Sequence, residues 1–150
     1  MNGGWSVATA TPVDVDSWLD IVVTVEPWFG PMPDFRATLD RSLRRGGARC
    51  VRSDDKVIGG ALLSRPEAAR IHWLAVRESH RRLGVASALV QAAIDEFAVA
   101  EEITVDTFGD DHPAGPPARR LYEAFGFQPA EILPLGPEGG SRQRYRRRRT

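Results

Sequence analysis

The apolar positions of this chain change their spacing several times, and residues 71–97 contain both a strand-like and a helix-like spacing. Ile71 to Val76 is a short apolar run that is typical of a buried strand. A polar turn at residues 77–82 and the small-residue segment 83–87 follow it. Apolar pairs then recur every four residues, which is the stripe of a helix packed along one face: Val85/Ala86, Leu89/Val90, Ala93/Ile94 and Phe97. The segment therefore predicts a strand, a turn and a helix in direct succession.

Before this segment the pattern predicts a strand and two helices. Residues 5–10 alternate well enough for a strand, and Asp14 is expected to cap a helix whose buried face is Trp18, Leu19, Val22 and Val23. Residues 26–33 contain three prolines and a glycine, which predicts an irregular loop. Asp34 is expected to cap a second helix, which Gly46-Gly47 ends and whose apolar stripe is Phe35, Leu39 and Leu43.

A hairpin is expected next. Residues 48–52 and 57–64 read as two strands, and the turn-forming residues 53–56 join them. Cys50 is expected to be a small buried residue rather than a nucleophile, because cysteine is among the residue types most often buried. Residues 65–67 make the connection to the strand that starts at Ile71.

The last third predicts a strand, a helix and a closing pair of strands. Residues 103–107 form a short β-rich run, and the loop 108–117 that follows is rich in Gly, Asp and Pro. A helix is expected after this loop, with Gly126 at its end and apolar positions Ala118, Leu121, Tyr122 and Phe125. Residues 127–135 and 141–147 read as the closing strands. Strands that alternate with helices favour an α/β (α+β) sheet of mixed pairing.

Length, composition and charge limit the number of domains, the kinds of partner and the expected location of the protein. The chain of 150 residues is expected to form one domain, residues 1–150, with a sizeable core. Twenty basic and twenty acidic side chains cancel, so the overall charge indicates neither a nucleic acid nor a membrane partner. Arginines gather at residues 144–149, but a terminal run of this kind is more often a solvated strand end than a phosphate-binding site. One cysteine, no signal-peptide pattern and no membrane-length apolar run favour a cytoplasmic location.

The turn before the helix at Val85 has the chemistry of an anion site. A helix that starts after a turn presents several unpaired backbone N–H groups and a partial positive charge. Arg81 and Arg82 can add charge-assisted hydrogen bonds, and Gly84 allows the backbone to approach a ligand closely. This segment is therefore expected to bind a phosphate group. The same residues could also be a basic turn ahead of an ordinary crossover helix.

Two motifs resemble those of the GCN5-related N-acetyltransferases, the GNAT family. Arg81-x-x-Gly84-x-Ala86 is similar to the signature whose loop holds the pyrophosphate of acetyl-coenzyme A in that family. Residues 118–127, in which Tyr122-Glu123 and Gly126-Phe127 stand at fixed places, resemble the second family motif. The order of predicted elements resembles the GNAT fold from Trp5 to about Arg148.

The resemblance implies a mixed, mostly antiparallel sheet of about seven strands flanked by four helices. The strands at 71–76 and 103–107 would splay apart, with acetyl-CoA in the gap. The implied cofactor-binding residues are Leu74, Ala75, Val76, Arg81, Arg82, Leu83, Gly84, Val85, Ala86 and Ser87. Family members often carry an Asn three residues before the helix alanine, where this chain has Gly115, so a cofactor contact from that loop is either missing or made by backbone.

The implied activity is transfer of an acetyl group to an amine, with no metal ion. Tyr122 would act as general acid on the leaving sulfur, because a phenol with a pKa of about 10 and a thiol with a pKa of about 8.5 are reasonably matched. For the base, His72, Glu26 and a chain of water molecules are all open. Trp28 and Phe29 are expected beside the acceptor, which can be a small molecule or a peptide. A non-catalytic domain that binds acyl-CoA as a sensor is the alternative, and a homodimer is open as well.

Overall fold

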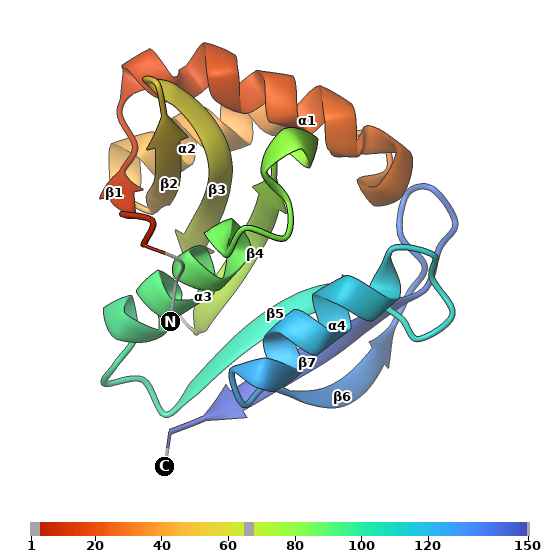
Figure 1. Ribbon diagram of the computed structural model, residues 1–150. Helices are drawn as coiled ribbons and strands as arrows, with labels where there is room; N and C mark the ends of the chain where they lie inside the picture. Colours follow the sequence, from red (N-terminus) through yellow and green to blue (C-terminus); the bar gives the residue numbers. More distant parts are fainter. Residues whose placement is uncertain (1–3, 65–67, 150) are drawn as a thin grey trace.

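The computed structural model describes residues 4–64 and 68–149, which form one sheet with helices on both faces (Figure 1). The connection predicted at residues 65–67 lies outside the described residues. The strands are β1 (Ala8–Thr9), β2 (Ala48–Ser53), β3 (Lys56–Ser64), β4 (Ala69–Val76), β5 (Glu102–Phe108), β6 (Gln128–Leu133) and β7 (Arg142–Arg148). Their spatial order is β1-β2-β3-β4-β5-β7-β6, and every described neighbouring pair is antiparallel except the parallel pair β4–β5.

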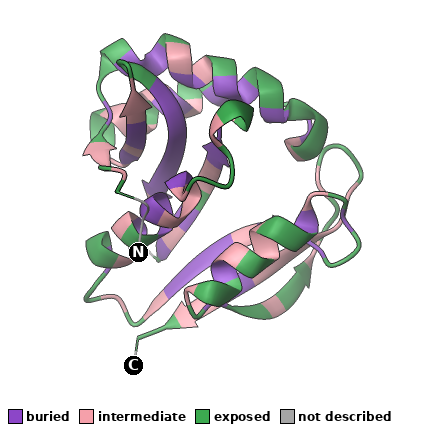
Figure 2. Cartoon of the chain, viewed as in Figure 1, coloured by how far each residue is buried: buried purple, intermediate pink, exposed green. Residues whose placement is uncertain are grey.

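The helices are α1 (Val15–Phe29), α2 (Phe35–Arg45), α3 (Val85–Glu96) and α4 (Gly115–Ala124), with 3₁₀ turns at Pro12–Asp14 and Glu78–His80. Helices α1 and α2 cover one face of β2–β4, α3 covers the other face, and α4 packs on β5 (Figure 1). Strand β3 is buried over almost its whole length because it has a helical layer on each side (Figure 2). The mixed sheet, its four helices and the order of the elements confirm the predicted fold class.

A β-bulge in β4 decides which of its side chains face which layer. Leu62 and Leu63 are consecutive in β3, yet they lie opposite Trp73 and Ile71, so His72 is an extra residue in the ladder. Side chains alternate along a strand, and one extra residue inverts the alternation. Ile71 therefore packs in the core beneath α3, whereas Trp73 packs in the core beneath α1 and α2.

The same bulge marks the place where the sheet opens. Strands β4 and β5 pair at three positions, Ala69–Ile103, Arg70–Thr104 and Ile71–Val105. Beyond Ile71 no residue of β4 pairs with β5 among the described residues, and the two strands diverge (Figure 1). Because a bulge bends its strand and increases the local twist, it directs the end of β4 away from β5. The expected splay is therefore confirmed.

Helix α1 corrects two expectations. It continues through Glu26, Pro27 and Trp28 to Phe29, so the loop predicted at 26–33 is irregular only after Gly30. A proline near the end of a helix removes one donor, and here Gly30, with φ of 87°, ends the helix. The predicted buried face is wrong at Val23, which is 70% exposed, because this residue is turned about 140° from Trp18 around the helix. The face instead contains Trp18, Ile21, Val22 and Val25.

Two further boundaries differ from the prediction. Strand β1 covers only Ala8–Thr9 of the predicted residues 5–10, because the indole of Trp5 leaves the sheet and donates to the carbonyl of Leu83 at 2.7 Å. Helix α4 starts at Gly115 rather than at Ala118. Pro116 and Pro117 occupy its first turn, where backbone N–H groups have no partner within the helix.

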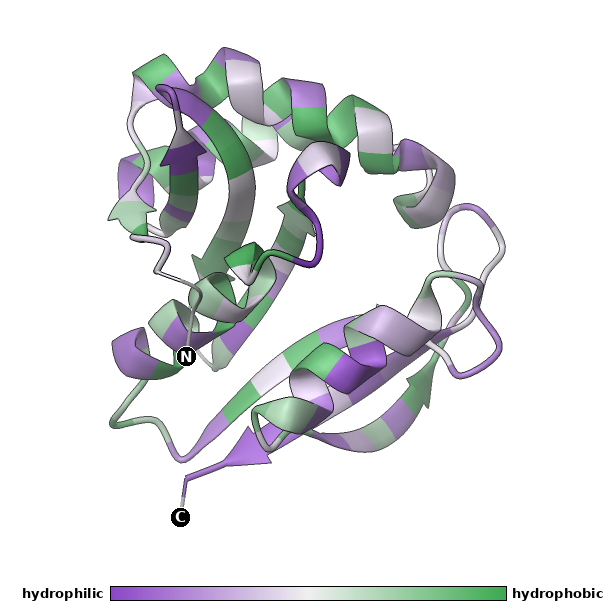
Figure 3. Ribbon diagram, in the orientation of Figure 1, coloured by the Kyte–Doolittle hydropathy of each residue, from purple (hydrophilic) through white to green (hydrophobic). Residues whose placement is uncertain are grey.

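The arginine-rich segment is only partly a solvated strand end. Residues 144–148 belong to β7, an interior strand between β5 and β6 that appears hydrophilic (Figure 3), whereas Arg148 and Arg149 at the end of the segment are exposed. Arg144 forms ion pairs with Asp106 of β5 and Glu131 of β6. Arg146 forms ion pairs with Glu102 of β5 and with the same Glu131. Acidic side chains therefore already neutralise these two arginines. None of the helices in the described part of the chain is long and apolar enough to cross a membrane.

Candidate functional site

A cavity of about 750 Å³ occupies the place where β4 and β5 separate. Its lining includes residues at the N-terminus of α3, the splayed part of β4, the facing side of α4 and the last turn of α1. The lining thus comes from both faces of the sheet, since α3 and α1 lie on opposite faces. Two ligands that approach from opposite faces could therefore meet in the gap.

The α3 end of the cavity contains the predicted anion site. Arg81, Arg82, Gly84, Val85, Ala86 and Ser87 all line the cavity. Gly84 has φ of 88° and Arg82 has φ of 63°, both in the left-handed region, where glycine is favoured and an arginine is rare. The first helical hydrogen bond of α3 runs from the N–H of Ala88 to the carbonyl of Gly84 at 3.0 Å, so the N–H groups of residues 85–87 precede the helical ladder.

Leu83 is the predicted loop residue that does not line the cavity. Its side chain is 51% exposed. Its carbonyl accepts the hydrogen bond from Trp5, and the Trp5 ring contacts His80 edge to face at 6.3 Å between centroids. The segment that precedes β1 therefore holds the loop in place from outside, a contact that sequence reasoning missed because 78 residues separate Trp5 and Leu83.

The exposed edge of β4 presents backbone donors to the gap. The N–H of Arg77 donates to the carbonyl of Ile58 at 2.7 Å across the β3–β4 ladder. In an antiparallel pair, alternate residues direct their N–H groups to the partner strand and away from it. The N–H groups of Leu74 and Val76 therefore point toward the gap, and Leu74, Ala75 and Val76 all line the cavity. Paired donors of this kind can polarise a carbonyl oxygen.

Tyr122 lies on α4 at the opposite wall of the gap. Its side chain is 5% exposed, lines the cavity and packs against Phe127 with 5.6 Å between ring centroids. Its hydroxyl has no hydrogen-bond partner among the described residues. Burial raises the pKa of Tyr122 above its ordinary value, so the phenol stays protonated at neutral pH. Tyr122 therefore presents a protonated hydroxyl, which can donate a hydrogen bond, at the cavity surface.

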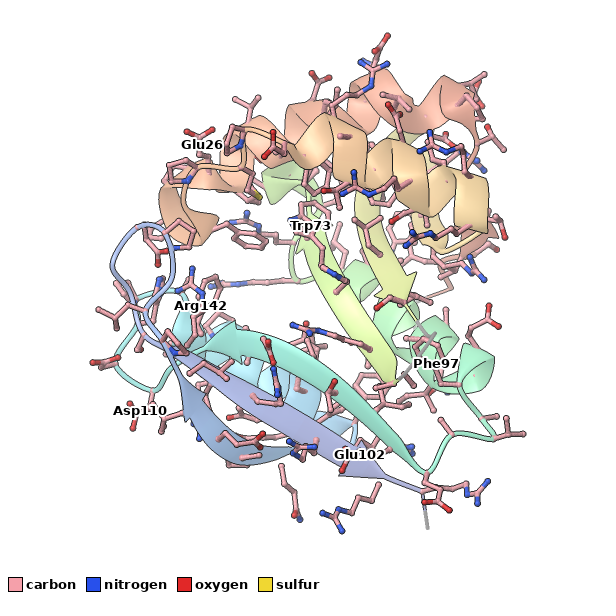
Figure 4. All side chains as sticks on the ribbon, turned by 180° about the vertical axis from the view of Figure 1, so that it is seen from behind. Glu26, Trp73, Phe97, Glu102, Asp110 and Arg142 are labelled. Carbon is pink, nitrogen blue, oxygen red and sulfur yellow. The ribbon has the colours of Figure 1, made fainter. Side chains whose placement is uncertain are left out.

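The structure separates the two candidate bases. His72, the bulged residue of β4, is exposed and lines the cavity. Glu26 is exposed on the last turn of α1 and is not part of the cavity lining (Figure 4). A group must lie within hydrogen-bond reach of the proton that it removes, directly or through one water molecule. Of the two, only His72 lies at the cavity, and its role as a base stays a prediction.

The α1 side of the cavity is an aromatic wall, defined by Trp28, Phe29, Trp73 and Phe108. Phe29 lies at the centre, 5.8 Å from Trp73 and 5.7 Å from Phe108 between ring centroids. Trp28 and Phe29 are at the cavity as predicted, although they lie on a helix rather than in a loop. Trp73 and Phe108 were missed, since simple alternation places Trp73 on the same side as Ile71 and nothing in the sequence reveals the bulge.

A polar network borders the aromatic wall. Arg142 of β7 donates to both carboxylate oxygens of Glu138, at 2.9 and 2.7 Å, and to the carbonyl of Phe29 at 3.3 Å. His112 completes the network, with its Nε2 2.8 Å from Glu138 and its Nδ1 accepting from the N–H of Ala114. The Arg142 guanidinium, with a smaller contribution from His112, lowers the pKa of Glu138 to about 2. The network ties the β6–β7 and β5–α4 loops to the end of α1, and Figure 4 shows Arg142 beneath that end.

Gly115 is not part of the cavity lining, although Ala114 before it and Pro117 after it in the same segment are. A Cβ atom at this position would lie 2.5 Å from the carbonyl oxygen of Gly109, so glycine permits a close approach of two backbone segments. Packing therefore accounts for this departure from the family pattern. Within residues 4–64 and 68–149, no group of three or more His, Cys, Asp or Glu side chains is arranged to hold a metal ion.

The sequence was compared with family models and with curated proteins. Residues 15–127 match the model described as the acetyltransferase (GNAT) family. No curated protein sequence matches the chain.

Solved structures give a second comparison. Ard1 from Thermoplasma volcanium superposes with a TM-score of 0.82 at 22% identity, over 97% of this chain and 98% of that one. A chain of the NatC complex bound to Gag peptide and CoA gives 0.77 at 18% identity, over 97% and 99%. The ribosomal-protein-S18-alanine N-acetyltransferase from Escherichia coli gives 0.74 at 18% identity, over 96% and 93%. At these identities the likeness establishes a shared fold.

Proposed function

The chain belongs to the acetyltransferase (GNAT) family, and on that basis we propose that it moves an acetyl group from acetyl-CoA to an amine by direct attack. The observation that carries the proposal is the continuity of the cavity. One space connects the anion site at α3, the donors of β4, the hydroxyl of Tyr122 and the aromatic wall at α1. A module that only binds acyl-CoA would need the α3 end and the gap, but not the aromatic wall on the α1 side.

The α3 end fits the phosphates of a coenzyme A molecule. Left-handed backbone at Arg82 and Gly84 turns the loop, so that the N–H groups of residues 85–87 lie at the cavity. These groups, the helix dipole and the guanidinium groups of Arg81 and Arg82 would hold a pyrophosphate. The gap between β4 and α4 would hold the remainder of the ligand. When bound, acetyl-CoA supplies an activated acyl group as a thioester.

The residues of the chain then have separate roles. The N–H groups of Leu74 and Val76 would polarise the acyl carbonyl from the β4 side. Tyr122 would donate its proton or a hydrogen bond to the departing sulfur from the α4 side. His72 would accept the proton of the attacking amine, directly or through water, because a primary alkyl amine with a pKa of about 10 is mostly protonated at neutral pH.

The proposal is tested in two steps. Acetyl-CoA at a hundredfold excess over its dissociation constant should stabilise the fold by about 2.7 kcal/mol, and thermal melts should rise by several degrees. A thiol-release assay with a panel of amines should then detect turnover. Stabilisation without thiol release from any amine would indicate the acyl-CoA-binding sensor instead. No thermal shift at any concentration of acetyl-CoA would contradict both functions.

A further inference from the structure

The aromatic wall limits what the acceptor can be. Besides the polar side chains of Asp106, Thr107 and Arg142, the cavity lining on the α1 side includes the aromatic wall together with Met32, Pro113 and Pro137. These side chains offer apolar contact and, except for the indole N–H groups, no hydrogen bonds. A substituent that contacts them gains most if it is apolar, because burial of apolar surface stabilises by about 25 cal/mol per Å².

Two charged residues of this region are already paired. Arg142 donates to Glu138, to the carbonyls of Gly140 and Ser141, and to Phe29. The Asp106 carboxylate accepts from Arg70 at 2.6 Å and from Arg144 at 2.7 Å. Both groups are therefore neutralised by partners within the protein. A carboxylate or ammonium group on the acceptor would gain less beside them than beside an unpaired charge.

The far end of the wall is bounded by a direct contact between segments. A Cβ atom at Gly30 would lie 2.7 Å from the Cβ of Pro137 in the β6–β7 loop, so the loop rests on the end of α1. The hydrogen bond from Arg142 to Phe29 crosses the same junction. An extended chain cannot run between two segments in such close contact. Trp28 and Pro113 line both this cavity and a neighbouring hollow of about 430 Å³, which Asp111 and Glu138 also line.

Together these contacts describe a mainly apolar acceptor region whose charged residues are paired within the protein and which the junction of Gly30 and Pro137 closes at one end. We propose that the acceptor is a small primary amine on an apolar skeleton of about the size of an aromatic ring, rather than a polypeptide terminus or a polyamine. The inference rests on the proposed acetyl transfer, because it assigns the aromatic wall to the acceptor. The amine nitrogen would point to His72 and the gap, and the apolar group would contact Phe29, Trp73 and Phe108.

The test compares four amines: 2-phenylethylamine, ethylamine, 1,4-diaminobutane and the peptide Phe-Gly-Gly. We expect kcat/KM for 2-phenylethylamine to exceed that of each of the others by about tenfold or more, since a few buried carbon atoms are enough for such discrimination. Equal values for 2-phenylethylamine and ethylamine would overturn the inference. So would a preference for the diamine, which would assign the acidic hollow to the acceptor, or for the peptide.

Variants and a binding measurement make the test specific. Phe29→Ala should reduce the advantage of 2-phenylethylamine over ethylamine to about threefold or less, with the thermal shift by acetyl-CoA retained. Phe29→Leu serves if the alanine variant does not fold. Val23→Ala, an exposed change on the same helix, should leave the ratio unchanged. An unchanged ratio in both Phe29 variants would remove the wall from acceptor recognition.

Calorimetry separates this inference from the proposed function. In the presence of coenzyme A, 2-phenylethylamine should bind about tenfold more tightly than ethylamine, whether or not turnover occurs. Equal binding contradicts the acceptor assignment alone. Failure of acetyl-CoA to bind or to release thiol contradicts the proposed transfer, and the calorimetric ratio still decides whether the wall selects an apolar amine.

Discussion

Tyr122→Phe tests the proposed chemistry most directly. The change removes the hydroxyl and keeps the ring that packs against Phe127. A hydrogen bond to a charged group contributes about 1.5–3 kcal/mol, and a departing thiolate is such a group. Loss of this bond corresponds to roughly a 10- to 150-fold decrease in kcat. The bond forms only as the sulfur departs, so the affinity for acetyl-CoA should change little.

The structure also predicts what Tyr122→Phe does not change. Because the hydroxyl has no partner among the described residues, its removal should alter the free energy of unfolding by less than about 0.5 kcal/mol. The raised pKa of Tyr122 keeps the phenol protonated, so deprotonation of this residue should not reduce the wild-type rate below about pH 10.

Tyr145→Phe is the matched control. Tyr145 is fully buried, its ring centroid lies 6.4 Å from that of Tyr122, and it does not line the cavity. Its hydroxyl donates to Glu123 at 2.8 Å, so its loss should cost about 1.5 kcal/mol of stability and leave kcat unchanged. The assay measures kcat, the dissociation constant of acetyl-CoA and chemical unfolding for both variants. Wild-type turnover in Tyr122→Phe, or an equal loss of rate in Tyr145→Phe, would refute the reasoning.

Three further predictions concern the loop and the core. Gly84→Val should weaken the binding of acetyl-CoA by about tenfold or more, because a φ of 88° is strained for a β-branched residue. Calorimetry should show a larger loss of affinity for this variant than for Arg82→Ala. A folded Gly84→Val protein with wild-type affinity would contradict the prediction. Hydrogen bonds from Arg52 lower the pKa of the buried Asp14, so this pair stabilises the fold above the unfolded pKa of 3.8 and stops doing so as the pH falls through the lower folded value. Arg52→Met should therefore cost about 2–3 kcal/mol at pH 7 in chemical unfolding and flatten the acid dependence, and an unchanged acid profile would disprove the assignment. Burial raises the pKa of Cys50 to about 11, so iodoacetamide at pH 8 should label this thiol only after unfolding, and rapid labelling of the native protein would be the contrary result.

The sequence predicted the elements whose signals are local. Glycines at positions 30, 46, 84 and 126 all have positive φ, and three of them end or start a helix where their position in the pattern indicated. The turn at residues 81–87 was predicted because a turn and the start of a helix determine its geometry, and phosphate binding by this turn stays a prediction. Tyr122 was found because it lies at helical spacing within a recognisable motif.

Features that depend on distant contacts were not predictable in the same way. The bulge at His72 appears only when β3 and β4 are paired, and without it Trp73 cannot be assigned to the side of the sheet that α1 and α2 cover. In the sequence, nothing distinguishes Arg142 from the other arginines near it. Its contacts with Glu138 and with the end of α1 form only in the folded protein. The prolines of residues 26–33 were given too much weight, since Pro27 is compatible with the last turn of α1.

The narrow pairing between β4 and β5 has a mechanical consequence. Three residue pairs and the ion pair between Arg70 and Asp106 join two half-sheets, each of which is broad and well packed. Strand pairing between the two halves is therefore confined to this short segment, while the shared core and the contact of Arg142 with α1 make the other connections. We expect local opening at this segment to require less free energy than opening within either half-sheet, and a ligand that fills the gap contacts both halves and stabilises the segment. The amide protons of Ile71 and Val105 should then exchange more slowly with solvent when the cavity is occupied. Hydrogen exchange at these two residues would therefore report ligand binding through the stability of the strand pairing.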